Sequence, residues 1–208
     1  MGRPLIQKVF GIGNPKIFFL KVFSSNYALY GDMSRRVMKT LAAFAPNIEQ
    51  YSIDEAFLDL SDCSKINLTQ YGRKIKRTVK QNTGIPVPIG IAKTKTLAKT
   101  ANYIAKKSNK ADGMLNLSRS IYHDQALKII LVEDVWGVGR KYARFLKSIG
   151  ITNTFQLRNT DEKLIKGKMG INGARLIQEL KGIACAIHWK VSRNQAKEYL
   201  SLELLKPP

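Results

Sequence analysis

Two adjacent carboxylates, Asp54 and Glu55, lie inside the mainly apolar segment Tyr51–Leu60, which reads Y-S-I-D-E-A-F-L-D-L. In one straight strand their side chains would point to opposite faces, so at least one would approach the core. A carboxylate there needs a Lys or Arg partner or a divalent cation, since burying an unpaired charge is unfavourable. If the backbone turns at or near Asp54, both carboxylates can reach one hard cation such as Mg²⁺, which also holds substrate phosphates. The pair therefore predicts a metal-assisted phosphate site; the alternative is a surface hairpin that the two residues close.

A second group of chemically useful side chains lies on a predicted helix that Thr94 or Thr96 can cap. Lys99, Asn102 and Lys106 share one face of this helix, because they are spaced by three, four and seven residues. Lys99 and Lys106 could both meet phosphate. The alternative interpretation is a solvated lysine face.

The segment 135–151, V-W-G-V-G-R-K-Y-A-R-F-L-K-S-I-G-I, has the pattern of a helix-hairpin-helix. In such a hairpin the backbone N–H groups of the glycine turn and of the following helix point at a DNA phosphate and read no base. Gly137, Gly139, Arg140 and Lys141 are the candidate DNA-binding residues. A tight connection between two helices without any ligand is the alternative.

The charge balance supports a polyanionic partner. The chain has 35 Lys and Arg against 15 Asp and Glu, a formal net charge of +20. Residues 63–111 contain no acidic residue at all. Nucleic acid answers such charge through counterion release, and an anionic membrane is the competing partner. Gly84, Pro86 and Pro88 interrupt the basic stretch, so it does not form one long interfacial helix.

With 208 residues and 44% hydrophobic content, the chain can bury a core of one domain or of two small ones. No apolar run approaches the roughly 18 residues of a membrane span, and residues 1–10 lack the apolar region of a signal peptide. We therefore expect a soluble, cytoplasmic protein without a membrane partner. Cys63 and Cys185 match neither a zinc nor a disulfide pattern, and His123 and His188 are isolated, so none of the four is expected to bind metal.

Strands and helices alternate up to about residue 120, and only helical patterns follow. The sequence thus predicts an α+β fold with a boundary near Ser118. Its expected elements are a brief strand at 17–20 in a connector, a helix from Ser24 or Ser25 that Pro46 ends, a strand–turn–strand at 48–60, a helix at 71–81, a β-like stretch at 84–92, a short strand at 113–117, a helix at 122–131, and a second helical pair at 161–182 with Gly170 and Gly173 at its turn.

Three motifs carry a family resemblance: Y-S-I-D-E-A-F-L-D-L, G-I-A-K-T-K-T-L-A-K-T-A-N-Y-I-A-K-K and D-V-W-G-V-G-R, joined by S-S-N-Y-A-L-Y-G-D-M-S-R-R-V-M. From Met1 to about Cys185 the chain resembles the Y-family translesion DNA polymerases of the bacterial UmuC type. The resemblance implies a partial polymerase palm, an antiparallel sheet with helices, in 1–118. It further implies an all-α helix-hairpin-helix thumb in 119–185, followed by a divergent tail in 186–208.

In that family the two carboxylates matching Asp54 and Glu55 hold two Mg²⁺ ions for nucleotidyl transfer. Lys106 matches a lysine that contacts the incoming triphosphate, and Gly137, Gly139, Arg140 and Lys141 match the thumb hairpin that grips duplex DNA. The implied partners are primer-template DNA, deoxynucleoside triphosphates, a UmuD-type accessory subunit and a recombinase filament, and the implied process is SOS mutagenesis during DNA repair.

The chain also departs from the family. A complete polymerase opens with a strand bearing D-x-N-x-F-Y, which supplies a third metal carboxylate, followed by fingers; residues 1–4 begin where the fingers end. The tail does not follow the family into its little finger. We therefore expect a polymerase fragment that binds DNA and is inactive alone. The alternatives are a non-enzymatic, sequence-independent DNA-binding protein and a decayed gene product that folds poorly.

Overall fold

The structure, a computed structural model, describes residues 5–10, 17–22, 24–63, 66–118, 121–185 and 199–203. Its strands and helices alternate in the first half of the chain, and helices dominate the second. In chain order they are β1 (Leu5–Phe10), β2 (Ile17–Val22), α1 (Tyr27–Leu41), β3 (Ile48–Gln50), β4 (Glu55–Asp59), α2 (Leu68–Thr83), β5 (Ile89–Ala92), α3 (Lys95–Lys107), β6 (Met114–Asn116), α4 (His123–Ile129), α5 (Arg140–Ser148), α6 (Thr154–Arg158), α7 (Glu162–Leu180) and β7 (Tyr199–Glu203).

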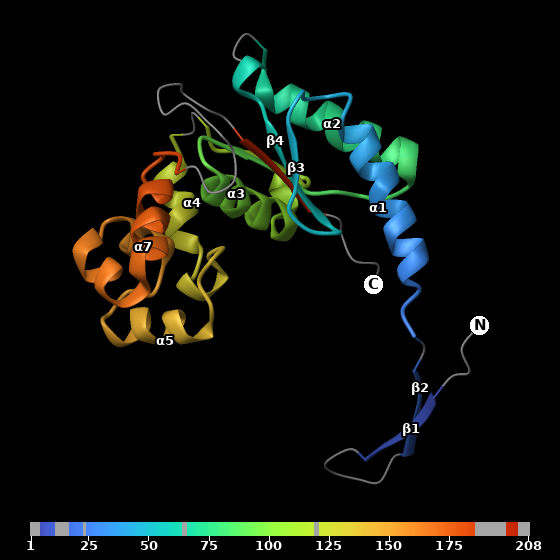
Figure 1. Ribbon diagram of the computed structural model, residues 1–208, viewed down its shortest axis with the longest axis horizontal. Coiled ribbons are helices and arrows are strands. Elements are labelled where there is room, and N and C mark those ends of the chain that lie inside the picture. The colour runs from blue at the N-terminus through green and yellow to red at the C-terminus, as the bar shows by residue number, and fades with distance from the viewer. Residues whose placement is uncertain are drawn as a thin grey trace.

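The main sheet has five strands in the order β3-β4-β7-β5-β6 (Figure 1). Neighbouring strands are antiparallel except for β5 and β6, which are parallel. Its central strand, β7, comes from the far end of the chain, where the sequence pattern predicts no strand. The backbone of Ser201 lies between Phe57 of β4 and Gly90 of β5. The central strand of the sheet is therefore supplied by a segment that is distant in sequence from both strands that it pairs with.

Helices cover both faces of this sheet. Helices α1 and α2 bury one face in a core of aliphatic side chains that includes Val37, Leu41, Ile75, Leu58 and Leu202. Helix α3 covers the other face so closely that a Cβ atom on Gly90 would overlap backbone atoms of Ala98 and Asn102. The buried Asn102 side-chain amide also donates to the carbonyl oxygens of Pro88, at 2.9 Å, and Ser201, at 3.0 Å. Glycine at one position and a satisfied amide at another thus fix α3 against the central strands.

The helices α4 to α7 gather beside α3 (Figure 1), and they share one hydrophobic core with it. A buried carboxylate at the end of α7 joins them to the start of α3. Glu179 accepts hydrogen bonds from the N–H groups of Thr96 at 2.9 Å and Cys185 at 3.0 Å, and its carbonyl oxygen accepts one from the Thr94 hydroxyl at 2.9 Å. The first N–H groups of a helix have no intrahelical partner, and a negative charge beside them is favourable. Glu179 therefore positions the helical part relative to the sheet.

Several expectations from the sequence are confirmed. The strand–turn–strand at 48–60 forms β3 and β4, and Thr94 caps α3 by accepting from the Leu97 N–H at 3.2 Å. Gly170, at φ 67°, interrupts α7 where the second helical pair was expected to turn, whereas Gly173 lies within the helix against Met169 and Ile165.

Other expectations need correction. The N-cap of α1 is Asn26, whose side chain accepts from the Leu29 N–H at 3.0 Å, and not Ser24 or Ser25. The expected connector with one brief strand contains two strands, β1 and β2, which pair with each other as a separate antiparallel sheet. In the described residues, no helix is long and apolar enough to cross a membrane.

Candidate functional site

The backbone bends at residues 52–54, directly before β4, and so sets the position of the two carboxylates. The N–H groups of Tyr51 and Ser52 both donate to the carbonyl oxygen of Glu55, at 3.0 and 3.2 Å. The Ser52 hydroxyl donates to Oδ1 of Asp54 at 2.6 Å. The expected turn of the backbone at or near Asp54 is therefore present. Glu55 itself belongs to β4 and its side chain is 22% exposed. Tyr51 and Ile53, in the turn between the antiparallel strands β3 and β4, are exposed, so the segment is also a hairpin at the surface.

Helix α3 brings lysines to the same face of the sheet. Lys99 Nζ lies 2.7 Å from Glu55 Oε1, and the Lys99 side chain is only 12% exposed. Lys106 Nζ lies 2.8 Å from Glu203 Oε1. Lys99 is thus largely buried in an ion pair, whereas Lys106 forms an ion pair with its side chain 37% exposed and stays partly solvated. Each lysine neutralises a carboxylate whose burial would otherwise be unfavourable.

Glu203 is a site residue that the sequence did not reveal. It lies on β7 directly opposite Glu55 on β4. Two like charges that face each other across a pair of strands repel each other. Lys99 and Lys106, which lie seven residues apart on one face of α3, offset that repulsion by pairing with Glu55 and Glu203. No local signal could identify Glu203, because its role depends on a strand pairing between distant parts of the chain.

The donor set of Asp54 and Glu55 suits a hard divalent cation, because Mg²⁺ takes carboxylate oxygens and commonly uses only one or two of them. In the described part of the chain, however, no three His, Cys, Asp or Glu side chains come close enough to form a metal-binding group. The residues therefore fit a site in which two carboxylates hold a metal together with substrate oxygens. They do not form an all-protein cage.

The predicted hairpin lies at the start of α5. Gly137 has a φ of 88°, which favours glycine, and Gly139 is the N-cap of α5 without a side-chain hydrogen bond to its first turn. Gly139, Arg140 and Lys141 are all exposed. The first-turn N–H groups of such a helix have no intrahelical partner, so this end of α5 presents N–H donors and two cations to solvent.

An aromatic cluster connects the hairpin to the carboxylates. The ring of Trp136, which precedes Gly137, lies 5.4 Å from the ring of Tyr51 and 5.6 Å from that of Phe57, measured between centroids. Tyr51 and Phe57 flank Asp54 and Glu55 in sequence. Edge-to-face packing of this kind is specific and favourable, so the position of the hairpin is coupled to that of the two carboxylates.

Burial shifts the pKa values of two of these isolated residues, His123 and Cys185. Burial and the charges of Arg158 and Lys93 lower the pKa of His123, and the nearby Asp124 only partly opposes them. Burial raises the pKa of the Cys185 thiol. Neither Cys63 nor Cys185 forms a disulfide in the part of the chain that the structure describes. The other histidine, His188, lies outside the described residues.

Tyr199 lies on β7 at the end of the sheet away from Glu55, opposite Asp59 of β4. Burial, aided by the negative charges of Asp59, Glu179 and Glu49, raises the pKa of Tyr199 to about 12. The phenol therefore stays protonated at neutral pH.

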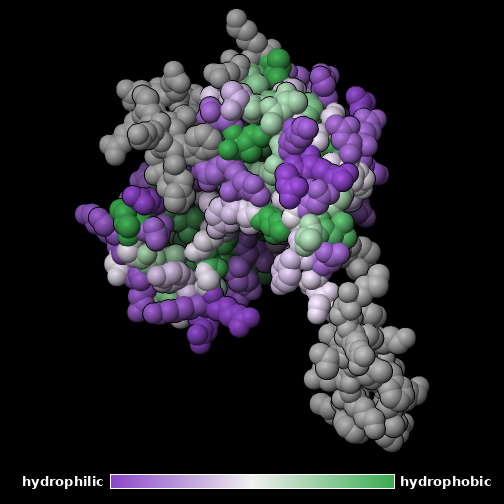
Figure 2. All heavy atoms as spheres, turned by 45° about the vertical axis from the view of Figure 1, so that its right-hand side comes forward, coloured by the Kyte–Doolittle hydropathy of each residue, from purple (hydrophilic) through white to green (hydrophobic). Residues whose placement is uncertain are grey.

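On the surface, hydrophilic side chains form broad patches, as Figure 2 shows. Such patches agree with a chain that carries 35 basic residues.

Comparison with known proteins shows which proteins this chain resembles. Residues 14–103 match the impB/mucB/samB family. The chain is 45% identical to protein UmuC of Salmonella typhimurium over 165 residues, which cover 78% of this chain and 39% of that protein. It is 35% identical to DNA polymerase IV of Treponema denticola over 156 residues, 74% of this chain and 38% of that protein. The chain thus spans about two fifths of the length of these curated relatives.

Solved structures share the fold. The crystal structure of DinB from Sulfolobus solfataricus matches with a TM-score of 0.60 and 28% identity, covering 74% of this chain and 45% of that one. An insertion ternary complex of Dbh DNA polymerase matches with a TM-score of 0.60 and 27% identity, over 74% of this chain and 46% of that one. A Y-family DNA polymerase chimera of Dbh and Dpo4 matches with a TM-score of 0.62 and 27% identity, over 80% and 48%. This chain is therefore similar over residues 14–103 to the impB/mucB/samB family and, over most of its length, to UmuC-type proteins, and it shares its fold with Y-family DNA polymerases.

Proposed function

We propose that this chain carries the metal-binding carboxylates and a DNA-gripping hairpin of an error-prone UmuC-type translesion DNA polymerase. The observation that supports it most is the bend directly before β4, which carries Asp54 and Glu55, with Lys99 of α3 in contact with Glu55 and Lys106 seven residues further along that helix. A metal-bound triphosphate needs carboxylates to hold its metal ion and cationic side chains to contact its phosphate oxygens, and this site contains both.

In this proposal, Asp54 and Glu55 would hold Mg²⁺, which when bound activates the primer hydroxyl and stabilises the leaving pyrophosphate. Lys106 would contact the triphosphate and would exchange its present partner, Glu203, for a phosphate oxygen. Lys99 would hold the Glu55 carboxylate in its orientation when no metal is bound. Trp136 holds the hairpin at a fixed place beside these groups.

The DNA partner is proposed from the α5 end. The N–H groups of the first turn, with Arg140 and Lys141, would contact phosphates of primer-template DNA without reading bases. Binding would then weaken steeply with salt. Deoxynucleoside triphosphates follow as substrates, and a UmuD-type subunit and a recombinase filament follow as partners from the family resemblance alone.

A second candidate function is DNA binding without catalysis. Two ion pairs favour it. Glu55, the proposed metal ligand, already pairs with Lys99, and Lys106, the proposed contact of the triphosphate, already pairs with Glu203. Primer extension with Mg²⁺ and four nucleotides distinguishes the two functions, with Asp54→Ala as the control. Extension by the chain that is lost in Asp54→Ala supports the polymerase. Equal DNA binding by both proteins, without extension by either, supports the binding module.

A further inference from the structure

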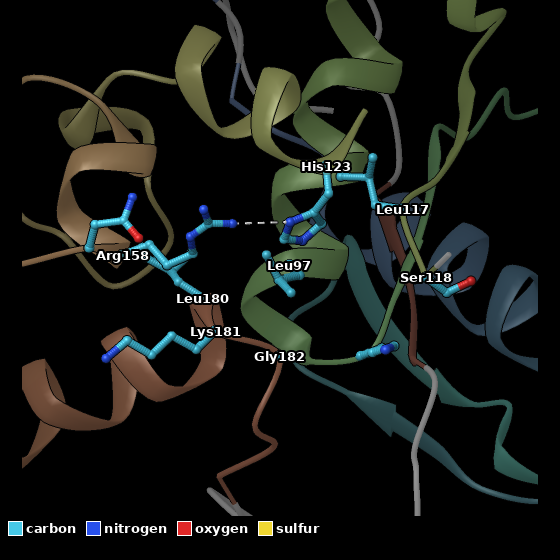
Figure 3. Close-up of a pocket in the computed structure, with 10 residues that line it drawn as sticks. Leu97, Leu117, Ser118, His123, Arg158, Leu180, Lys181 and Gly182 are labelled. Carbon is cyan, nitrogen blue, oxygen red and sulfur yellow. Dashed lines mark hydrogen bonds between the residues drawn. The ribbon is translucent and has the colours of Figure 1, made fainter. Parts of the chain in front are cut away.

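A cavity of about 460 Å³ lies where the helical part meets the sheet and α3, away from the two carboxylates (Figure 3). Cavities of this size accept small organic ligands. The lining comes from the loop after β5, from α3, from the residues after β6, from the start of α4 and from the ends of α6 and α7. The lining residues are Lys93, Leu97, Leu117, Ser118, His123, Arg158, Asn159, Leu180, Lys181 and Gly182.

This cavity is separate from the Asp54–Glu55 site. Strands β4 and β5 are both antiparallel to β7 and so run in the same direction. Glu55 opens β4, whereas Lys93 follows the last residue of β5. The two sites therefore lie at opposite ends of the sheet, and a ligand in the cavity would not compete with groups held by Glu55.

The lining carries cations and no carboxylate. Lys93, Arg158 and Lys181 contribute three positive charges, and neither lysine forms an ion pair with any described residue. Lys181 extends away from His123, whereas the Arg158 side chain reaches towards it (Figure 3). Lys93 lies against the turn at Gly182, where its Cδ would be 4.0 Å from an added Cβ. Arg158 and Lys93 are thus the two cations that a ligand inside the cavity would meet.

Arg158 is built into the wall of the cavity and is not a loose surface side chain. It is only 15% exposed, and its Nη1 donates to Asp124 Oδ1 at 2.7 Å and lies 3.4 Å from His123 Nδ1. Its Nε and Nη2 atoms have no hydrogen-bond partner among the described residues. The Asp124 side chain is 57% exposed and does not line the cavity. A guanidinium can hold a second anion with its remaining donors.

The size of the cavity bears on the ligand. Leu97, Leu117 and Leu180 in its lining are at most 4% exposed and so offer little surface of their own. A bare inorganic anion would leave most of the volume of about 460 Å³ empty, whereas a ligand with an anionic end and a larger organic body would fill it.

We propose that this cavity binds a small organic phosphate the size of a nucleoside monophosphate, with its phosphate on Arg158 and Lys93 and its organic part in the remaining volume of the cavity. The same phosphate chemistry occurs at the end of a DNA strand. The proposal commits to the free nucleotide, and it does not depend on polymerase activity.

The test is calorimetric titration of the intact chain with dAMP in EDTA, which prevents metal-dependent binding at Asp54 and Glu55. We expect saturable binding that Arg158→Gln and Lys93→Gln each weaken by about tenfold, the loss expected for one charged hydrogen bond. Lys39→Gln, an equal charge change on exposed α1, and Asp54→Asn should bind as the parent does. Equal affinity of the parent and both cavity variants would overturn the proposal, as would no binding.

Two further arms test where and how the ligand binds. Bound phosphate offsets the charges of Arg158 and Lys93, so the pKa of His123, followed by NMR with His188→Gln to assign the signal, should rise when dAMP binds. Binding without that rise places the ligand elsewhere and contradicts the proposal. Inorganic phosphate that binds as tightly as dAMP would exclude a role for the organic part of the ligand. A DNA duplex that displaces dAMP would assign the cavity to the DNA interface. Either result would overturn the proposal.

Discussion

Lys106 Nζ lies 2.8 Å from Oε1 of Glu203, so the lysine that the family resemblance assigns to a triphosphate is held by a carboxylate of the central strand. The same strand sets Glu203 opposite Glu55, which pairs with Lys99 at 2.7 Å. The protein thus contains an internal competitor for phosphate at Lys106. Any nucleotide that binds there must replace an existing ion pair.

Glu203→Gln should raise the affinity for deoxynucleoside triphosphate by about two- to fivefold, because a partly exposed ion pair contributes up to about 1 kcal/mol. Lys106→Gln should lower it. Equilibrium dialysis with labelled dATP and Mg²⁺ measures both. Glu133→Gln, which frees Lys147 on α5 from a pair at 2.6 Å, is the matched control and should leave dATP binding unchanged. An unchanged affinity in Glu203→Gln would show that Lys106 does not bind the triphosphate.

DNA binding should depend on the hairpin at the start of α5. Arg140→Gln and Lys141→Gln should each weaken binding to unrelated duplexes to the same extent, because phosphate contacts carry no sequence information. Each should also reduce the slope of log affinity against log salt by about 1. Fluorescence anisotropy over a series of salt concentrations measures both quantities, with Lys39→Gln on α1 as the control. A control that weakens binding as much as Arg140→Gln would exclude a specific role for the hairpin.

Much of this arrangement is readable from the sequence. The apolar stretch around Asp54 and Glu55 predicts a strand–turn–strand, the threonine before α3 predicts its cap, and the glycines of the hairpin predict the turn before α5. Each depends on neighbours along the chain, where local propensity and periodicity act.

The remaining features depend on tertiary contacts. Tyr199–Glu203 is too short to be distinguished as a strand by pattern alone, and its place between β4 and β5 depends on pairing with both. The opposition of Glu203 and Glu55 follows from that pairing. The contact of Trp136 with Tyr51 and the cap that Glu179 provides for α3 likewise join distant segments.

Glu179 should be important for stability. The residue is 2% exposed, and its carboxylate accepts hydrogen bonds from the N–H groups of Thr96, at the start of α3, and of Cys185. Glu179→Gln should lower the free energy of unfolding by about 1.5–3 kcal/mol, the range for hydrogen bonds to a charged group. Urea denaturation measures this change. Glu133→Gln on the surface should cost at most about 1 kcal/mol, and an equal loss in both variants would contradict a special role for Glu179.

Stability should decrease in mildly acidic solution because of His123. Burial, Arg158 and Lys93 hold its pKa in the folded protein below the usual 6.5, so the unfolded chain binds more protons between those two pKa values. The contribution of His123 is thus fully present above pH 6.5 and is lost as pH falls towards the lower, folded value. Urea denaturation at a series of pH values should show this decrease in the parent and in His188→Gln. The decrease should be smaller in His123→Asn, and an identical decrease in His123→Asn would assign it to other groups.

Binding of Mn²⁺ in place of Mg²⁺ tests the central claim most directly, because it needs neither primer nor turnover. The electron paramagnetic resonance signal of free Mn²⁺, recorded with dATP present, gives the affinity of the parent, Asp54→Asn, Glu55→Gln and the exposed control Asp32→Asn on α1. The proposed site predicts that Asp54→Asn and Glu55→Gln each weaken binding by about tenfold or more, the effect of losing one charged ligand, while Asp32→Asn binds as the parent does. Equal Mn²⁺ affinity in all four proteins would contradict a metal site at Asp54 and Glu55.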